Sequence, residues 1–149
     1  DVPLVLSFIQ ELAEFEHLSH TLVVTEDLLR AELFGEYPVA EVIIGYLTGE
    51  PVSFALFFHN FSTFLGRRGI YLEDLYVKPK VRGRGIGREM LGYVARLAKE
   101  RRCGRLEWSV LDWNEKAIRL YEGLGAVAMD EWRLFRLMGE ALEGLAGEA

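Results

Sequence analysis

The chain lacks the cross-links on which many small proteins depend. Cys103 is its only cysteine, so no internal disulfide can form, and this suits a reducing compartment such as the cytoplasm. His17, His20 and His59 have no metal-site spacing with one another or with Cys103, so we expect no metal. At 149 residues, 50% of them hydrophobic, the chain is long enough to bury a core without such cross-links.

Other absences exclude classes of partner. No run of about 18 apolar residues occurs, so we expect neither a membrane span nor a membrane partner. No basic and then apolar leader precedes the first predicted helix, and the opening Asp1 in place of methionine indicates a truncated or processed N-terminus. Lys and Arg total 17 against 23 Asp and Glu, for a net charge of −6. This balance disfavours nucleic acid as a partner and attracts cations.

The spacing of apolar residues predicts alternating helices and strands. Without repeats or linkers, the order predicts one domain over residues 1–149, a mixed α/β sheet with helices on its faces. Thr25 and Asn114 are the expected N-caps of two helices. The predicted helices are 4–18, 25–34, 86–103, 114–125 and 140–146, and the predicted strands are 39–47, 52–59, 70–77, 105–111 and 132–138, with a loop at 61–69.

A basic, glycine-rich turn at residues 77–88 separates a predicted strand from a long helix. Glycines let backbone N–H groups point inward, and the helix N-terminus adds positive charge, which suits a pyrophosphate. The Lys-Ser/Thr pair of an NTP-binding loop is missing, and Arg88 stands where a dinucleotide fingerprint needs its third glycine. An ordinary tight turn is the alternative. Besides Arg88, the candidate pyrophosphate-binding residues of this turn are Arg82, Gly83, Arg84, Gly85 and Gly87.

Two carboxylates, Glu73 and Asp74, interrupt the apolar strand 70–77. Burying a carboxylate without partners is costly, so the presence of two carboxylates in one apolar strand requires an explanation. Consecutive strand residues face opposite sides of a sheet, so we expect the two to have different roles. The alternative is a structural ion pair with an arginine.

Several segments together point to a family. Arg82-x-x-Gly85-x-Gly87, after a strand and opening a helix, resembles the acetyl-CoA pyrophosphate loop of the GNAT acetyltransferases. Residues 12–16, 71–77, 110–115 and 117–121 resemble the branch that holds the diamine/polyamine (spermidine/spermine) and thialysine acetyltransferases, and the likeness runs from about 12 to 138. The resemblance implies a mixed, mostly antiparallel sheet with splayed middle strands and helices on both faces. The family's usual first strand, ahead of the helix at 4–18, is absent.

The resemblance also implies roles for residues. Glu73 would face the substrate amine and accept its proton, directly or through water, and Tyr121 would protonate the departing thiolate. From the pattern alone, Tyr121 is a core tyrosine, and Glu16 is as well explained as a solvated surface residue. The implied amine site comprises Phe15, Glu16, Glu73 and Asp74. The implied cofactor site comprises the backbone of Leu75, Tyr76 and Val77, the loop residues Arg82, Gly83, Arg84, Gly85, Ile86, Gly87 and Arg88, and the side chain of Asn114.

We therefore expect an enzyme that moves an acetyl group from acetyl-CoA to a primary amine of a small cation, by direct attack. The alternatives are a GNAT enzyme acting on a protein N-terminus or lysine, and a non-catalytic acyl-CoA-binding module. Members of the resembling branch are homodimers, and the predicted strand 132–138 and the loop around Phe64 are candidate interface segments.

Overall fold

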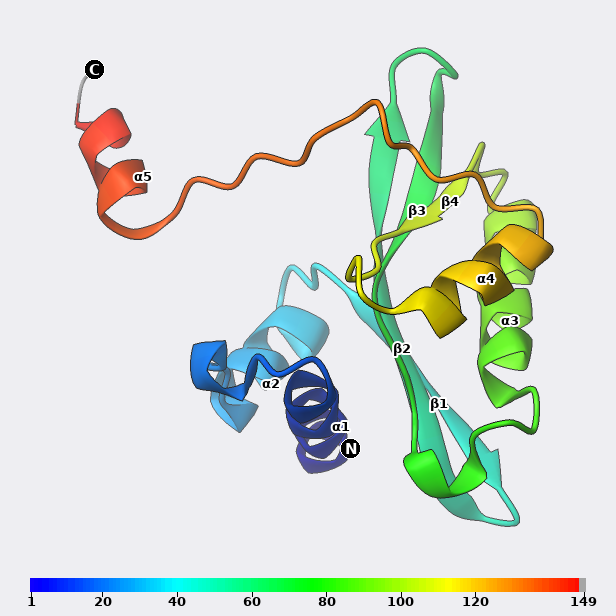
Figure 1. Cartoon of the computed structure of the whole chain (residues 1–149). Coiled ribbons are helices and arrows are strands. Elements are labelled where there is room, and N and C mark those ends of the chain that lie inside the picture. The colour runs from blue at the N-terminus through cyan, green and yellow to red at the C-terminus, as the bar shows by residue number, and fades with distance from the viewer. Residues whose placement is uncertain (148–149) are drawn as a thin grey trace. The chain divides into compact units, whose positions relative to one another are not determined.

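The computed structural model describes residues 1–147, and its contacts divide the chain into two compact units, Asp1–Leu111 and Asp112–Ala149. Each unit is described by itself (Figure 1). The first unit contains α1 (Val2–Phe15), α2 (Glu26–Phe34), β1 (Glu41–Leu47), β2 (Glu50–Ser62), β3 (Arg67–Val77), α3 (Ile86–Glu100) and β4 (Leu106–Trp108), with single 3-10 turns at Ser19–Thr21 and Pro79–Val81. The second contains α4 (Glu115–Gly123) and α5 (Gly139–Ala146).

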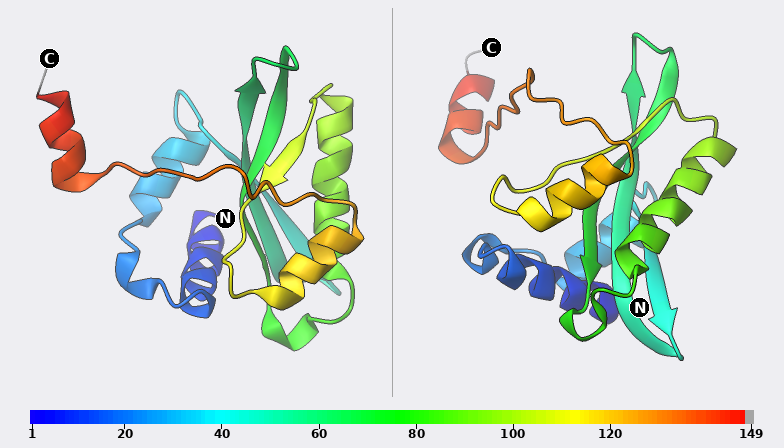
Figure 2. Two further views of the ribbon diagram at one scale, coloured as in Figure 1. Left: turned by 45° about the horizontal axis from the view of Figure 1, so that its top comes forward. Right: turned by 45° about the vertical axis from the view of Figure 1, so that its right-hand side comes forward.

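The first unit is a sheet of order β1-β2-β3-β4 with helices on both faces. The pairs β1–β2 and β2–β3 are antiparallel, and β3–β4 is parallel. A parallel pair needs a crossover connection, and α3 supplies it. Figures 1 and 2 show α1 and α2 on one face of the sheet and α3 on the other. The predicted mixed, mostly antiparallel α/β sheet is confirmed.

Strand β3 contains a β-bulge. Leu56 of β2 pairs with Asp74, but the next residue, Phe57, pairs with Leu72, so Glu73 is an extra residue on β3. A bulge bends its strand and disrupts the ladder at that point. The bulge therefore changes which side chains of β3 share a face.

Strand β4 diverges from β3 at the same place. Its pairing with β3 covers only Ile70, Tyr71 and Leu72, and in Figure 2 β4 lies beside the first half of β3. Beyond Leu72 the edge of β3 that faces away from β2 has no strand partner in the described part of the chain. This is the predicted splay of the middle strands.

Aromatic packing fixes α1 to the sheet. The Phe8 ring is fully buried and stacks on Phe54 of β2, with centroids 5.2 Å apart and planes at 16°. Tyr76 of β3 meets the same ring edge-on, with centroids 6.4 Å apart. On the opposite face α3 buries Met90, Leu91, Val94 and Ala98.

The sequence-based boundaries were wrong in three places. Most of the loop predicted at 61–69 is strand, because β2 continues to Ser62 and β3 begins at Arg67. Strand β4 has three residues, whereas 105–111 was predicted. The segment 132–138 forms no strand. Alternating apolar residues show that a segment can be a strand, but a strand also needs a paired neighbour, and local pattern does not reveal one.

The second unit has no core of its own. Asn114 caps α4 as predicted, its Oδ1 accepting a hydrogen bond from the Ala117 N–H at 3.4 Å. None of the residues described from 112 to 147 is buried. No helix in the described part of the chain has the length and apolar character needed to span a membrane.

Replacing Phe8 by alanine tests the attachment of α1. Phe8→Ala should lower the free energy of unfolding by about 3–5 kcal/mol, because the stacked ring leaves a cavity between α1 and the sheet. Phe34→Ala, which removes a 67% exposed ring at the end of α2, is the matched control. Urea denaturation followed by circular dichroism gives both values. Equal losses for the two variants would contradict the central role of Phe8.

Candidate functional site

The bulge brings two carboxylates to one face of the sheet. Asp74 lies two residues before Tyr76, whose ring meets α1, so Asp74 also faces α1. Leu72 faces α3, because its partner Phe57 lies 5.8 Å beneath the guanidinium of Arg101 at the end of α3. Glu73, next to Leu72, therefore faces α1 as well. The expectation that the two carboxylates face opposite sides was wrong, because a bulge inserts one residue into the alternation.

A third carboxylate joins them from α1. Glu16 is the C-cap residue of that helix and is half-buried, as is Asp74, while Glu73 is exposed. Burial, with the charges of Glu73 and Glu16, raises the pKa of Asp74 to about 7. Burial and the Glu73 charge also raise the pKa of Glu16. We call Glu16, Glu73 and Asp74 the carboxylate cluster.

The salt bridges described within the first unit do not involve the carboxylate cluster. They pair other acidic residues with lysine or arginine side chains. These salt bridges give no support to the alternative of an arginine ion pair for Glu73 or Asp74. Like charges gathered in a partly desolvated place repel one another, and a bound cation would relieve that repulsion.

Arg82 lies against aromatic rings. Its guanidinium carbon is 4.6 Å from the centroid of Phe15 on α1 and 5.3 Å from that of Tyr76 on β3. Its Nε donates a hydrogen bond to the Val77 carbonyl oxygen at 2.8 Å. The predicted anion-binding arginine is thus also a link between α1 and the turn that follows β3.

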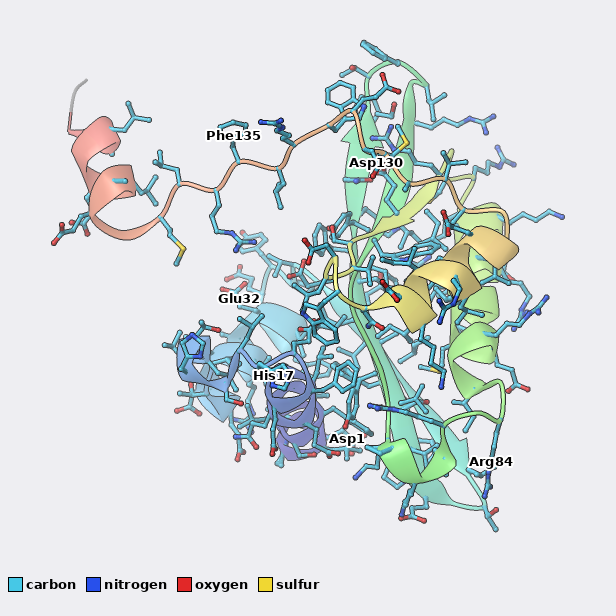
Figure 3. All side chains as sticks on the ribbon, in the orientation of Figure 1. Asp1, His17, Glu32, Arg84, Asp130 and Phe135 are labelled. Atoms are coloured by element: carbon cyan, nitrogen blue, oxygen red, sulfur yellow. The ribbon has the colours of Figure 1, made fainter. Side chains whose placement is uncertain are left out.

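The glycine-rich turn has the conformation expected of an anion loop. Gly83 and Gly85 have φ of +83° and +80°, the left-handed region that favours glycine. Gly85 is the N-cap of α3 and supplies no side chain to the first-turn N–H groups. A Cβ on Gly87 would meet only Val77 Cγ2, at 3.8 Å, so packing within the protein does not require that glycine. Arg84 is exposed on this loop (Figure 3).

A separate groove of about 740 Å³ lies between β1, β2 and α3. Ile86 and Arg88, both predicted cofactor residues, line it, but none of the carboxylate cluster does. It lies on the α3 side of the sheet, whereas the carboxylates face α1. The size of this groove does not by itself identify it as the reaction site. The clustering of Glu16, Glu73 and Asp74 favours the α1 face of the sheet instead.

Two predicted residues belong to the second unit. Tyr121 is half-buried on α4, and Asn114 lies at the start of that helix. No residue described in this unit is buried. The alternative that Tyr121 is a core tyrosine is therefore not supported within this unit. The catalytic role of Tyr121 and the cofactor role of Asn114 stay predictions.

Sequence reasoning missed Glu11 and Lys78. The Tyr76 Oη donates to Glu11 at 3.4 Å, and the Lys78 Nζ forms an ion pair with Glu11 at 3.3 Å. The Lys78 ammonium also lies 5.5 Å from the centroid of Phe8. Glu11 is three residues after Phe8 and four before Phe15, so helical spacing could have placed it on their face of α1.

Substitution of Asp74 should change how stability depends on pH. The folded Asp74 stays protonated up to about pH 7, whereas an unfolded aspartate ionises near 4. The folded state thus holds more protons between these values, and stability falls as pH rises through that window. Asp74→Asn removes the ionisation, so its melting temperature should match wild type near pH 4.5 and exceed it by several degrees, about 2–4 °C per kcal/mol, at pH 8.

Scanning calorimetry at the two pH values measures this difference. Asp130→Asn, at an exposed position of the second unit, is the control and should show the same offset from wild type at both. If the offset for Asp74→Asn is also independent of pH, Asp74 ionises normally in the folded protein.

Comparison with known proteins agrees with this geometry. The profile described as "Acetyltransferase (GNAT) family" matches residues 7–126. The thialysine N-epsilon-acetyltransferase of Bos taurus is 43% identical over 155 residues, which cover 97% of this chain and 91% of that protein. The L-ornithine N5-acetyltransferase of Arabidopsis thaliana is 32% identical, over 97% and 83% of the two chains. The solved structure of an integron cassette protein from V. cholerae superposes with a TM-score of 0.81 at 28% identity, over 97% and 90%. The chain therefore belongs to the GNAT acetyltransferase family.

Proposed function

We propose that this protein transfers the acetyl group of acetyl-CoA to a primary amine of a small cationic substrate, a diamine, a polyamine or a lysine-like amino acid. The observation that carries the proposal is the carboxylate cluster, three neighbouring acidic groups that form none of the salt bridges described within the first unit. The names of the relatives support it, since one acetylates thialysine and another ornithine. Each of these substrates carries a side-chain amine that is cationic at neutral pH.

The carboxylate cluster would bind and deprotonate the amine. Glu16 holds the ammonium group by charge, and Asp74, whose pKa is about 7, adds its charge once it has ionised beside the cation. Glu73, the exposed member at the bulge, accepts the proton of the ammonium group directly or through water. Deprotonation is required because an ammonium ion has no lone pair with which to attack. The shared face of the three side chains supports this division of labour.

The residues beyond the bulge fit acetyl-CoA. The unpaired edge of β3 offers the backbone groups of Leu75, Tyr76 and Val77 to the pantetheine arm, which would pair with them as a strand would. The left-handed turn at Gly83 and Gly85, with Gly87 and the uncapped start of α3, offers N–H groups to the pyrophosphate. Arg82, Arg84, Ile86 and Arg88 complete the proposed loop contacts, and Asn114 would bind the pantetheine arm.

When bound, acetyl-CoA supplies a thioester whose carbonyl carbon is the electrophile. Transfer by direct attack forms a C–N bond and breaks the C–S bond. The ammonium gives one proton to Glu73 before the attack, and the second proton, lost from nitrogen as the amide forms, replaces the proton that Tyr121 gives to the thiolate. The Tyr121 hydroxyl would then donate its proton to the departing thiolate, whose conjugate acid has an ordinary pKa near 8.5. No metal is needed for these steps.

We also propose a homodimer in the cytoplasm. The described part of the second unit exposes many large apolar side chains while burying none, and Figure 3 shows Phe135 projecting from the extended segment before α5. A large exposed apolar surface usually marks an interface. A single cysteine suits a reducing compartment. The side chains in question include Val127, Met129, Trp132, Leu134, Phe135, Leu137 and Met138.

Steady-state kinetics tests the activity. With acetyl-CoA, release of free thiol should be fast for thialysine, ornithine, lysine, spermidine or putrescine, and slow for an uncharged amine or a histone peptide. Glu73→Gln should raise KM for the preferred amine and lower kcat, while acetyl-CoA affinity stays constant. Tyr121→Phe should lower kcat by a factor of about 10²–10⁴ with little change in cofactor binding.

The matched control is Glu32→Gln, an exposed carboxylate on α2 (Figure 3), which should leave all constants unchanged. Binding of acetyl-CoA without turnover of any amine would favour a non-catalytic module. Turnover of the histone peptide alone would favour a protein substrate.

Light scattering tests the assembly. At micromolar concentration the mass should be twice the 17.0 kDa of one chain. Phe135→Asp should shift the mass toward the monomer, because a carboxylate would be desolvated at the interface. A monomeric wild-type protein would contradict the proposed dimer.

A further inference from the structure

The face of the sheet that carries the carboxylate cluster continues past it toward the hairpin between β2 and β3. Tyr71 lies two residues before Glu73, and because Leu72 between them faces α3, Tyr71 lies on the α1 side of the sheet. Phe58 of β2 pairs with Tyr71, and their ring centroids are 5.4 Å apart. In Figure 1 the hairpin extends beyond α1 and α2. The two rings therefore form an apolar surface beside the carboxylate cluster.

An ion pair lies next to Tyr71 on the same face. Glu107 of β4 pairs with Tyr71 in the sheet, so the two side chains share a face. The Arg105 Nε forms an ion pair with Glu107 Oε1 at 3.1 Å, and Asn60 Nδ2 donates a hydrogen bond to the same oxygen at 3.5 Å. The side chain of Arg105 is 42% exposed and that of Glu107 is 37% exposed. A ligand on this face can therefore reach a positive and a negative group together.

Gly69 makes room for this ion pair. It lies two residues before Tyr71, and a Cβ added there would meet Arg105 Cγ at 3.3 Å and Asn60 Oδ1 at 2.6 Å. The stem of Arg105 therefore lies over Gly69, on the same face as Glu107. The ion pair joins Nε to one carboxylate oxygen, whereas a guanidinium has five N–H donors and a carboxylate has two oxygens. Each group can bind a ligand while the pair stays intact.

The distance from the ion pair to the carboxylate cluster suits a basic amino acid. With about 3.3 Å per residue along a strand and about 4.8 Å between strands, the backbones of Glu73 and Glu107 are about 8 Å apart. The four-carbon stem of a lysine-like side chain bridges a comparable distance, and it would lie on the rings of Phe58 and Tyr71. The Tyr71 hydroxyl is held toward β4 by Ser109, with the two oxygens 2.6 Å apart.

We propose that Arg105 and Glu107 form a subsite for the head group of an amino-acid substrate, in which the guanidinium binds the α-carboxylate and the carboxylate binds the α-ammonium. The side-chain ammonium of the same substrate then lies at the carboxylate cluster. Opposite charges set side by side match a zwitterion, and the planar fork of a guanidinium matches a carboxylate. A diamine or polyamine has no carboxylate for Arg105, whose charge repels it. This inference rests on the proposed function and selects basic amino acids among its candidate substrates.

Three amines that differ only in the head group test the subsite. Lysine has an α-ammonium and an α-carboxylate, cadaverine lacks the carboxylate, and ε-aminocaproate lacks the α-ammonium. Release of free thiol from acetyl-CoA gives kcat/KM for each amine. In the wild-type protein kcat/KM for lysine should exceed that for each of the others about tenfold or more, because either deletion removes a hydrogen bond between charged groups.

Substitutions should remove the two preferences separately. Arg105→Gln should lower kcat/KM for lysine about 10- to 100-fold relative to cadaverine, and Glu107→Gln should lower it by a similar factor relative to ε-aminocaproate. Arg105→Lys keeps the charge but loses the fork, so its effect should be smaller and in the same direction, and it carries the test if Arg105→Gln does not fold. Arg30→Gln and Glu32→Gln, at exposed positions on α2, remove the same charges and should keep the wild-type ratios. Circular dichroism shows whether each variant is folded.

Three results would overturn the inference. A wild-type protein that uses cadaverine as well as lysine would show that the subsite gains nothing from a carboxylate. An unchanged ratio of lysine to cadaverine in Arg105→Gln, or of lysine to ε-aminocaproate in Glu107→Gln, would give the substituted residue a structural role only. In each case acetylation of small cationic amines would survive, whereas failure of every amine to react would contradict the proposed function and this inference together.

Discussion

The β-bulge at Glu73 is the constraint on which the rest of the first unit depends. By adding one residue to β3, it turns Glu73 and Asp74 to the same face as Glu16. It also stands at the point where β4 leaves β3, so the next residues keep a free backbone edge. One local irregularity thus produces both a cluster of negative charge and an open strand edge, and a regular ladder would provide neither.

This arrangement has an energetic cost that the surrounding packing must offset. Burial and the charges of Glu73 and Glu16 disfavour a further negative charge, so Asp74 retains its proton up to about pH 7. Phe8 of α1 stacks on Phe54 of the sheet, and Tyr76 contacts its edge. This packing keeps α1 on the sheet despite the unfavourable electrostatics. Functional sites commonly hold charged groups in such unfavourable surroundings, because a bound ligand of opposite charge reduces the repulsion.

The stretch from Glu73 to Arg88 carries both halves of the proposed chemistry. Its first residues face α1, where we propose that the amine binds, and its last residues form the glycine-rich turn and the start of α3. Arg82 lies between them and contacts both sides. A short segment of the chain therefore carries residues proposed for both ligands.

The sequence by itself determined the helices, the first four strands along the chain and the family, because apolar spacing, caps such as Thr25, and the Arg82-x-x-Gly85-x-Gly87 turn are local in the chain. It also identified Glu73, Asp74 and Glu16 as residues of interest. Only the tertiary structure decided that these three share a face, since a bulge is defined by pairing with another strand. It likewise decided that 132–138 is not a strand and that Arg82 rests on Phe15, because partners distant in sequence are set by packing.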